Sequence, residues 1–301
     1  MTTRPARAVF SWLLVFGVFL SKAVIAEITL PQANGEVVHL PASAERIITL
    51  APNLAELVFA AGAGEQLVAV VEYSNFPQQV KTLPRVGDAF RIDLERVIGL
   101  QPDLIIAWQS GNPQTALQKL QQLGFTVWQV EITRPEEIAD VVENIARATG
   151  TEEHGKQIAK QLRGRLTKLK QQNSEKPPLS YFYQIAARPL YTINGQHIIS
   201  RSLEVCGAVN VFSDLSALAP QVSRESVILA DPQAMIAPEI PGELPALNVW
   251  RDWPQLRAVE TAALLYLPVD EISQATPRLL DSIELACKLL DGVREKQLDN
   301  L

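Results

Sequence analysis

Apolar residues follow two alternating patterns in the first half of this chain. Short continuous apolar runs, typical of buried strands, occupy 46–50, 67–71, 104–108 and 125–130. Segments whose apolar residues are three or four positions apart, as on one face of a helix, lie between or after these runs at 54–61, 94–100, 115–123 and from Pro135. Strands that alternate with helices at this spacing predict βα units around a mostly parallel sheet.

The second half repeats this organisation after one long polar segment. Residues 151–172 contain no proline and place Ile158, Leu162, Leu166 and Leu169 near one face, which predicts a single long helix. Strands are then predicted at 180–185, 190–193, 234–237 and 263–267, with helices around Leu203 and over 276–292. The fold class is therefore α/β, with two Rossmann-like lobes, 27–150 and 177–301, joined by a helix over 151–176.

An internal repeat supports two equivalent lobes. Asp93-Leu94-Glu95-Arg96-Val97-Ile98 precedes Pro102 and an apolar strand, and Ser223-Arg224-Glu225-Ser226-Val227-Ile228 precedes Pro232 and another. Glu95 and Glu225 are 130 positions apart, as are the two prolines. Asp93 and Ser223 are good helix N-caps, and a glutamate in the first turn suits the helix dipole. Capping alone is thus a sufficient structural reason for both glutamates.

The first 26 residues have the order of a secretory signal peptide. Arg4 and Arg7 precede an apolar run of about 13 residues, and small residues follow before Ala26. Such a run is shorter than the roughly 20 residues that span a bilayer, so a membrane anchor is the weaker alternative. We therefore expect cleavage after Ala26 and a soluble mature protein in the periplasm.

Charge and cysteine content restrict the function further. The formal charge of the whole chain is −6, and it falls to −9 when the signal peptide is removed, because that segment holds Arg4, Arg7 and Lys22 but no acid. A negative balance disfavours a nucleic-acid-binding protein. Cys206 and Cys287 are too few for a thiolate-rich metal site. In an exported protein they form a disulfide most simply, with two free buried thiols as the alternative.

The motifs that accompany common enzyme classes are missing from the sequence. It has no nucleophile elbow, zinc-protease helix motif, P-loop or dinucleotide-binding glycine motif. His39, His154 and His197 lie in unrelated contexts, without the spacing of metal ligands. We expect a non-enzymatic protein with no cofactor and no metal site, and keep an exported enzyme on this scaffold as the alternative of a different class.

Aromatic residues near the ends of predicted strands suggest a ligand site. Tyr73 follows the strand that ends at Val71, Trp108 ends the next one, and Phe90 and Tyr191 lie in similarly irregular segments. In open α/β sheets ligands bind outside the carboxyl ends of the strands, where aromatic side chains offer flat apolar area. The competing interpretation is that each of these residues caps the core of its lobe.

Five segments together resemble one family. They are Ile47-Ile48-Thr49-Leu50-Ala51-Pro52-Asn53-x-x-Glu56-Leu57, Tyr73-Ser74-Asn75-Phe76-Pro77, Leu94-Glu95-Arg96-Val97 with Pro102-Asp103-Leu104-Ile105, Leu203-Glu204-Val205-Cys206-Gly207 and Pro220-Gln221-Val222-Ser223-Arg224-Glu225. The chain is similar to the periplasmic substrate-binding proteins of iron-chelate and cobalamin ABC importers, with the cobalamin binders as the nearest pattern. The resemblance implies a monomer of two α/β lobes joined by a rigid helix. It also implies a small-molecule ligand in the cleft and delivery to a permease–ATPase complex in the inner membrane.

The resemblance also implies roles for single residues. Glu95 and Glu225 match surface glutamates that contact permease arginines, and Cys206 and Cys287 match a disulfide. Tyr73, Trp108, Tyr191 and Asp270 match ligand contacts. Three positions depart from the cobalamin binders, because Ala89, Ala219 and Glu271 stand where those proteins have aromatic residues, although Phe90 partly compensates for the first. The expected ligand is cobalamin or a related corrinoid, with a ferric siderophore or haem as the rival.

Overall fold

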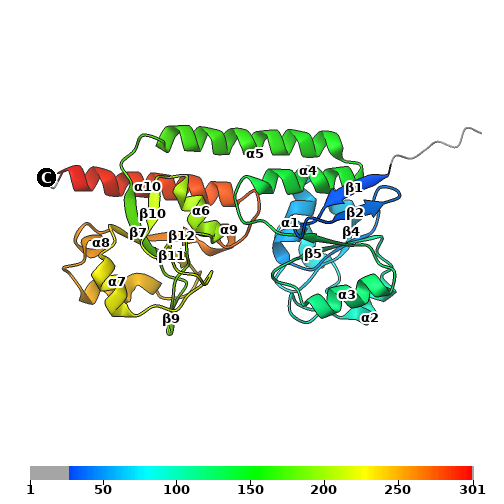
Figure 1. Cartoon of the computed structure of the whole chain (residues 1–301), viewed down its shortest axis with the longest axis horizontal. Helices are drawn as coiled ribbons and strands as arrows, with labels where there is room; N and C mark the ends of the chain where they lie inside the picture. The colour runs from blue at the N-terminus through cyan, green and yellow to red at the C-terminus, as the bar shows by residue number, and fades with distance from the viewer. Residues whose placement is uncertain (1–26, 300–301) are drawn as a thin grey trace, which may run out of the picture.

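The computed structural model describes residues 27–299, which form two α/β lobes side by side beneath one long helix, α5 (Glu152–Asn173) (Figure 1). The predicted signal peptide, 1–26, lies outside the described residues. Among the helices of the described part, none combines the length and the apolar composition that a membrane span requires.

The first lobe is built on a four-stranded parallel sheet. Its order is β4-β3-β5-β6, and the strands are β3 (Ile47–Thr49), β4 (Leu67–Ala69), β5 (Leu104–Trp108) and β6 (Val127–Val130). All pairs in this sheet are parallel. The predicted strands are confirmed, with ends trimmed by one or two residues at three of the four.

The second lobe repeats that topology. Its parallel sheet has the order β10-β7-β11-β12, from β7 (Leu179–Tyr183), β10 (Ala208–Asn210), β11 (Ala234–Glu239) and β12 (Leu264–Pro268). In each lobe the second strand lies outside the first, and the third and fourth follow on the other side. The internal repeat seen in the sequence is therefore a repeat of structure, since β5 and β11 occupy equivalent places.

One predicted strand lies outside the second sheet. The segment 190–193 forms only β9 (Leu190–Tyr191), which pairs antiparallel with β8 (Ala186–Ala187). Beyond β9 the backbone bonds to a loop instead, because the amide of Thr192 donates to the carbonyl of Pro220 at 3.0 Å. The sheet edge is filled by β10, a strand of three residues that is too short for a periodicity to reveal.

Helices cover both faces of the first sheet because alternate residues of each strand point to opposite faces. One buried cluster combines Ile47, Leu104 and Ile106 with α1 (Pro52–Ala60) and α4 (Glu137–Thr149). A second combines Ile48, Ile105 and Ala107 with α2 (Leu94–Gly99) and α3 (Gln114–Gln122).

The second lobe carries shorter helices and one long one. They are α6 (Ile198–Glu204), α7 (Arg224–Ala230), α8 (Arg257–Glu260), α9 (Val269–Ile272) and α10 (Leu279–Asp299). The last helix was expected to stop at Gly292 but continues through it, because one glycine weakens a helix without ending it. Cys206, just after α6, forms a disulfide with Cys287 of α10, which confirms that expectation.

The remaining elements are small. An antiparallel hairpin of β1 (Ile28–Pro31) and β2 (Val37–Leu40) opens the described chain and was not foreseen. Three short 3₁₀ helices lie in loops, at Gly64–Gln66, Gln78–Thr82 and Ala246–Asp252.

The helix α5 is fixed to both lobes. Gly150 ends α4 in the left-handed region, at φ +74°, and lets the chain reverse into α5. Arg163 then pairs with Asp140 of α4 at 2.6 Å, while Arg165 pairs with Asp281 of α10, also at 2.6 Å. Ion pairs thus tie α5 to one helix of each lobe, and α5 runs along one side of the molecule (Figure 1).

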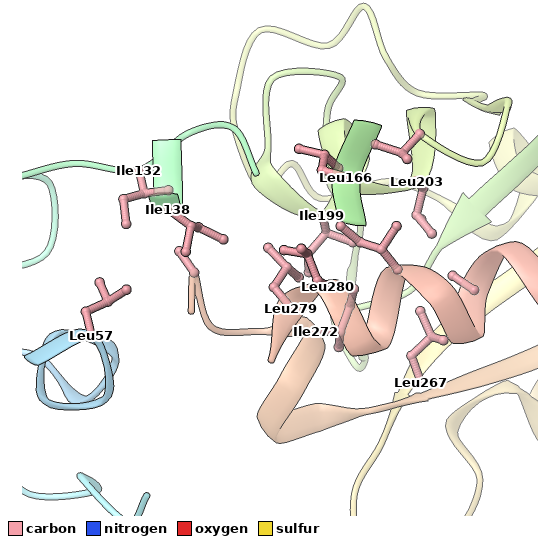
Figure 2. Packing of buried hydrophobic residues seen from close by; sticks show 14 of the residues in the cluster. Leu57, Ile132, Ile138, Leu166, Ile199, Leu203, Leu267, Ile272, Leu279 and Leu280 are labelled. Carbon is pink, nitrogen blue, oxygen red and sulfur yellow. The ribbon is translucent and has the colours of Figure 1, made fainter. Parts of the chain in front are cut away.

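The lobes also meet directly beside the cleft. One cluster of buried apolar side chains includes Leu57 and Ile138 of the first lobe and Leu279 and Leu280 of the second (Figure 2). Close by in the chain, Arg278 Nη2 donates to Glu56 Oε2 of α1 at 2.7 Å, and the glutamate is only 4% exposed. The guanidinium of Arg278 also lies 4.0 Å from the ring centroid of Phe76 in the first lobe.

Candidate functional site

A cavity of about 530 Å³ lies between the lobes at the carboxyl ends of the first lobe's strands. The order β4-β3-β5-β6 sends the chain in opposite directions after β3 and β5, so the loops that follow these strands separate and leave a crevice. Residues 51–53 follow β3, residues 110–112 follow β5 and residues 131–133 follow β6. The second lobe closes the cavity with the start of α6, Leu218 and residues 273–275.

The lining is apolar and largely uncharged. Its apolar members are Ala51, Pro52, Ala89, Phe90, Trp108, Ile132, Ile198, Leu218 and Ala275. Its uncharged polar side chains are Asn53, Ser110, Asn112, Thr133, Gln196, Ser273 and Gln274. Glu131 and His197 are the ionisable groups among the described lining residues, which include neither lysine nor arginine. Such a surface suits a large apolar ligand with an uncharged polar rim.

Two of the predicted ligand contacts, Trp108 and Phe90, line this cavity together. Trp108 is half-buried at the end of β5, and its indole Nε1 donates to Ser110 Oγ at 3.0 Å. Phe90 projects from a loop with 77% of its surface exposed. That loop is tied to the strand ends by Asn112, whose Nδ2 donates to the carbonyls of Leu50 and Ala89.

Tyr73 is placed differently from Trp108, since it does not line this cavity and is 77% exposed. Its backbone lies in the left-handed region, at φ +66°, a conformation that costs energy in a residue other than glycine. Arg85 holds the turn in place by donating to the carbonyls of Val71 and Ser74 on either side. Strained residues of this kind are common at functional sites.

Asp270 and Tyr191 also lie outside the cavity between the lobes. Asp270, exposed at the start of α9, lines a second cavity of about 450 Å³ in the second lobe, together with Glu271 and Arg278. Tyr191 is half-buried in β9 and bridges to Gln221 through its backbone. The structure thus brings Trp108 and Phe90 together in one cavity but not the other three predicted contacts, and the ligand-binding roles of all five remain predictions.

Glu131 and His197 were not singled out by the sequence, although a signal existed for the first. Glu131 directly follows the predicted strand 125–130, and the aromatic residues were identified by the same kind of position at the end of a strand. Burial raises the pKa of its carboxyl group above the ordinary value, against the opposing effect of hydrogen bonds from Ser110. Burial lowers the pKa of His197, whose Nδ1 accepts the backbone N–H of Ile199 at the start of α6. Its neutral ring therefore carries the proton on Nε2.

The two predicted docking glutamates are exposed in equivalent places. Glu95 lies in the first turn of α2, capped by Asp93, and Glu225 lies in the first turn of α7, capped by Ser223. Both helices lie on the side of their lobe away from α5 (Figure 1). A hydrogen bond from its own backbone amide, helped by the Ser223 hydroxyl, lowers the pKa of Glu225 and keeps it ionised.

Comparison with known proteins gives consistent matches. Residues 47–239 match the sequence pattern of the family described as periplasmic binding protein. A vitamin B12-binding protein of Vibrio cholerae serotype O1 is 40% identical over 258 residues, which are 85% of this chain and 92% of that protein. The vitamin B12-binding protein of Photorhabdus laumondii is 36% identical over 247 residues, 82% of this chain and 88% of the relative.

Solved structures agree with these matches. The crystal structure of the periplasmic vitamin B12 binding protein BtuF of Vibrio cholerae superposes with a TM-score of 0.77 at 39% identity, covering 83% of this chain and 98% of that one. The periplasmic heme binding protein HutB of Vibrio cholerae superposes with a TM-score of 0.71 at 23% identity, covering 81% and 98%. The second likeness shows a shared fold alone.

Proposed function

The chain belongs to the periplasmic binding protein family, and we propose that it captures vitamin B12 or a related corrinoid between its lobes for delivery to an ABC importer. The vitamin B12-binding relatives support this proposal, since two of them match more than four fifths of the chain at 36% and 40% identity. The observation that carries it is the aromatic but almost uncharged cavity between the lobes.

The shape and apolar part of the cavity suit a flat macrocycle. Trp108 and Phe90 contribute aromatic surface on one side, while Leu218 and Ile198 contribute apolar surface from the other lobe. Flat rings gain most by burying their faces against such side chains. A volume of about 530 Å³ is within the usual range of ligand sites and is open to the cleft, so part of a large ligand can project outwards.

The polar part of the cavity favours carboxamides over carboxylates. A corrin ring carries carboxamide groups on its rim, whereas haem carries two propionates and many ferric siderophores are anionic. A carboxylate placed here would lose water without gaining a lysine or arginine among the described lining residues, and it would approach Glu131. Carboxamides instead find Asn53, Gln196 and Gln274 as partners, with a hydrogen-bond donor at Nε2 of His197.

A co-elution experiment tests this selectivity. Purified residues 27–301 are incubated with cyanocobalamin, haemin or a ferric siderophore, and the visible spectrum of the protein peak is recorded after gel filtration. We expect the corrinoid spectrum to co-elute with the protein and to weaken strongly in Phe90→Ala and Trp108→Ala. The matched control is Leu123→Ala, at an exposed leucine beyond α3. Co-elution of haemin or the siderophore in place of the corrinoid would contradict the proposal.

Two exposed glutamates support the proposed delivery to an importer. We propose that Glu95 and Glu225 contact basic residues on a permease that has the matching two-fold arrangement. One ionised carboxylate on each lobe, at equivalent helices, offers two points of attraction that steer association more than they strengthen it. The role requires export, which the predicted signal peptide at 1–26 would provide, and it requires no catalysis.

Charge reversal tests this docking role. The double variant Glu95→Lys and Glu225→Lys should bind cyanocobalamin with unchanged affinity but support little uptake in cells that depend on this protein. The matched control is Glu153→Lys, an exposed first-turn glutamate of α5 on the opposite side of the molecule. Uptake at the control level by the double variant would show that these glutamates do not dock the permease.

A further inference from the structure

The indole of Trp108 is held by two neighbours that line the same cavity, Ser110 and Glu131. Its Nε1 donates to Ser110 Oγ at 3.0 Å, and that hydroxyl donates in turn to Glu131 Oε1, also at 3.0 Å. The other carboxylate oxygen of Glu131 accepts the backbone N–H of Ser110 at 2.9 Å. Glu131 thus holds both the backbone and the side chain of Ser110.

The backbone beneath the indole is fixed as well. The side chain of Asn112, only 5% exposed, accepts the N–H of Trp108 at 2.6 Å and ties it to the carbonyls of Leu50 and Ala89. Gly111 lies directly against the ring, because a Cβ at that position would be 2.8 Å from Cδ1 of Trp108. The ring therefore rests on a backbone that tolerates no larger side chain in this arrangement.

Among residues 27–299, the hydroxyl of Ser110 is the single hydrogen-bond partner of the indole N–H. A hydroxyl can donate one hydrogen bond while accepting another. By fixing the hydroxyl of Ser110, the carboxylate of Glu131 therefore also fixes the orientation of the indole. A hydrogen bond to a charged acceptor is stronger than one between neutral groups, and here the carboxylate is partly shielded from water. An aromatic wall that is fixed before the ligand arrives loses less conformational freedom on binding.

We propose that Ser110 and Glu131 form a positioning relay that fixes the orientation of Trp108 in the cleft and thereby sets the affinity for the ligand. This inference rests on the proposed function and deepens it. Ser110 and Glu131 act through Trp108 and are positioning residues, while the indole is the group that contacts the ligand.

A double-mutant cycle tests the relay, with cyanocobalamin as the probe. Ser110→Ala should weaken binding about three- to tenfold, the usual effect of one lost hydrogen bond. Ser110→Thr, which keeps the hydroxyl, should restore most of the affinity. In a Trp108→Phe background, which has no indole N–H, Ser110→Ala should cause no further loss. An equal loss in both backgrounds would overturn the relay, because Ser110 would then contact the ligand directly.

A second measurement needs no ligand and separates this proposal from the proposed function. The fluorescence of Trp108, taken as the difference between the wild-type protein and Trp108→Phe, is quenched with acrylamide in the free protein. Ser110→Ala and Glu131→Ala should each make that signal easier to quench, and Ser110→Thr should not. Unchanged quenching in both alanine variants would contradict the relay, whereas failure of the wild-type protein to bind cyanocobalamin would contradict only the proposed function.

Discussion

The imidazole of His197 connects the packing of the second lobe with the lining of the cleft. Its Nδ1 caps α6 by accepting the backbone N–H of Ile199, which a protonated ring cannot do. Burial lowers the pKa of His197, because a charged ring would lose its hydration inside the protein. The helix cap and the neutral state therefore depend on each other.

A pH dependence of stability follows from His197. The unfolded chain binds a proton near the ordinary pKa of 6.5, but the folded protein does so only at lower pH. The free energy of unfolding should therefore fall as the pH drops below about 6.5, until His197 is protonated in the folded state as well. His197→Asn keeps a capping side chain and removes the titration, so its stability should fall less between pH 7 and pH 5.

Urea unfolding at several pH values checks this prediction. Both proteins retain His39 and His154, so the difference between their curves isolates position 197. Parallel dependence on pH would show that the imidazole does not titrate with folding.

At the same scale, the sequence predicted the aromatic residues better than their partners. Trp108 was recognisable because it ends a predicted strand, and Phe90 because it lies in an irregular segment, the kind of place where ligands bind in open α/β sheets. His197 gave no signal, since the three histidines are far apart in the chain and only the second lobe's approach brings one to the cavity. The left-handed backbone of Tyr73 was also invisible, because it depends on Arg85 reaching across from another segment.

Among the elements, the disulfide joins the segment just after α6 to α10. Cys206 and Cys287 lie 81 positions apart, so the bond closes a large loop that contains three strands of the second sheet. The chain-entropy model assigns such a loop about 4–5 kcal/mol as an upper value. The bond therefore stabilises the second lobe chiefly by restricting its unfolded state.

Replacing both cysteines measures this contribution. The variant Cys206→Ala and Cys287→Ala should lose up to about 4–5 kcal/mol in the free energy of unfolding. Unfolding in guanidinium, with and without a reductant, checks this, because the reductant should weaken the wild-type protein and leave the variant unchanged. Equal stability of the two oxidised proteins would contradict the prediction.

Helices and strands were predictable where the apolar periodicity extended over many residues. They were less predictable where a short segment is fixed by its pairing or packing with neighbouring elements. The long helix α5 was expected over 151–172 and spans Glu152–Asn173, because many apolar residues share one face. The three-residue strand β10 and the hairpin of β1 and β2 were missed, since a short run carries no clear period. Helix α10 passes through Gly292, a position where the sequence alone suggested an end, because Leu290 and Val293 on either side of it are buried in the core.

At the scale of the whole molecule, the ion pair between Glu56 and Arg278 joins the two lobes beside the cleft. The carboxylate accepts three hydrogen-bond contacts from the guanidinium, and the glutamate is nearly inaccessible to water. Phe76 covers the guanidinium from the first lobe. Because the partners are 222 positions apart, this contact depends on both lobes being folded and in place.

Breaking the pair on one side should be costly. Glu56→Gln leaves a partly buried guanidinium without its charged partner and should lower the free energy of unfolding by about 2–3 kcal/mol, below the usual range for fully buried pairs. The double variant Glu56→Leu and Arg278→Met should recover much of that loss, because neither charge remains. Urea unfolding distinguishes these cases, and a Glu56→Gln protein as stable as the wild type would count against the role of this pair.

The two-lobed arrangement itself was predictable, because both the repeat at an offset of 130 residues and the long helix between its copies can be recognised in the sequence. The contacts between the lobes were not. Glu56 lies within a segment of family resemblance, yet nothing in the sequence connects it with Arg278. The cavity is likewise formed by loops from both lobes, so its lining follows from the assembled molecule and from neither half alone.

The central claim is that the cleft binds a corrinoid, and isothermal titration of cyanocobalamin into residues 27–301 tests it most directly. We expect one site per molecule and a heat that is largely lost in the double variant Phe90→Ala and Trp108→Ala, whose thermal unfolding should remain cooperative. Absence of binding heat from the folded wild-type protein across several temperatures, or binding that the double variant leaves intact, would contradict the claim.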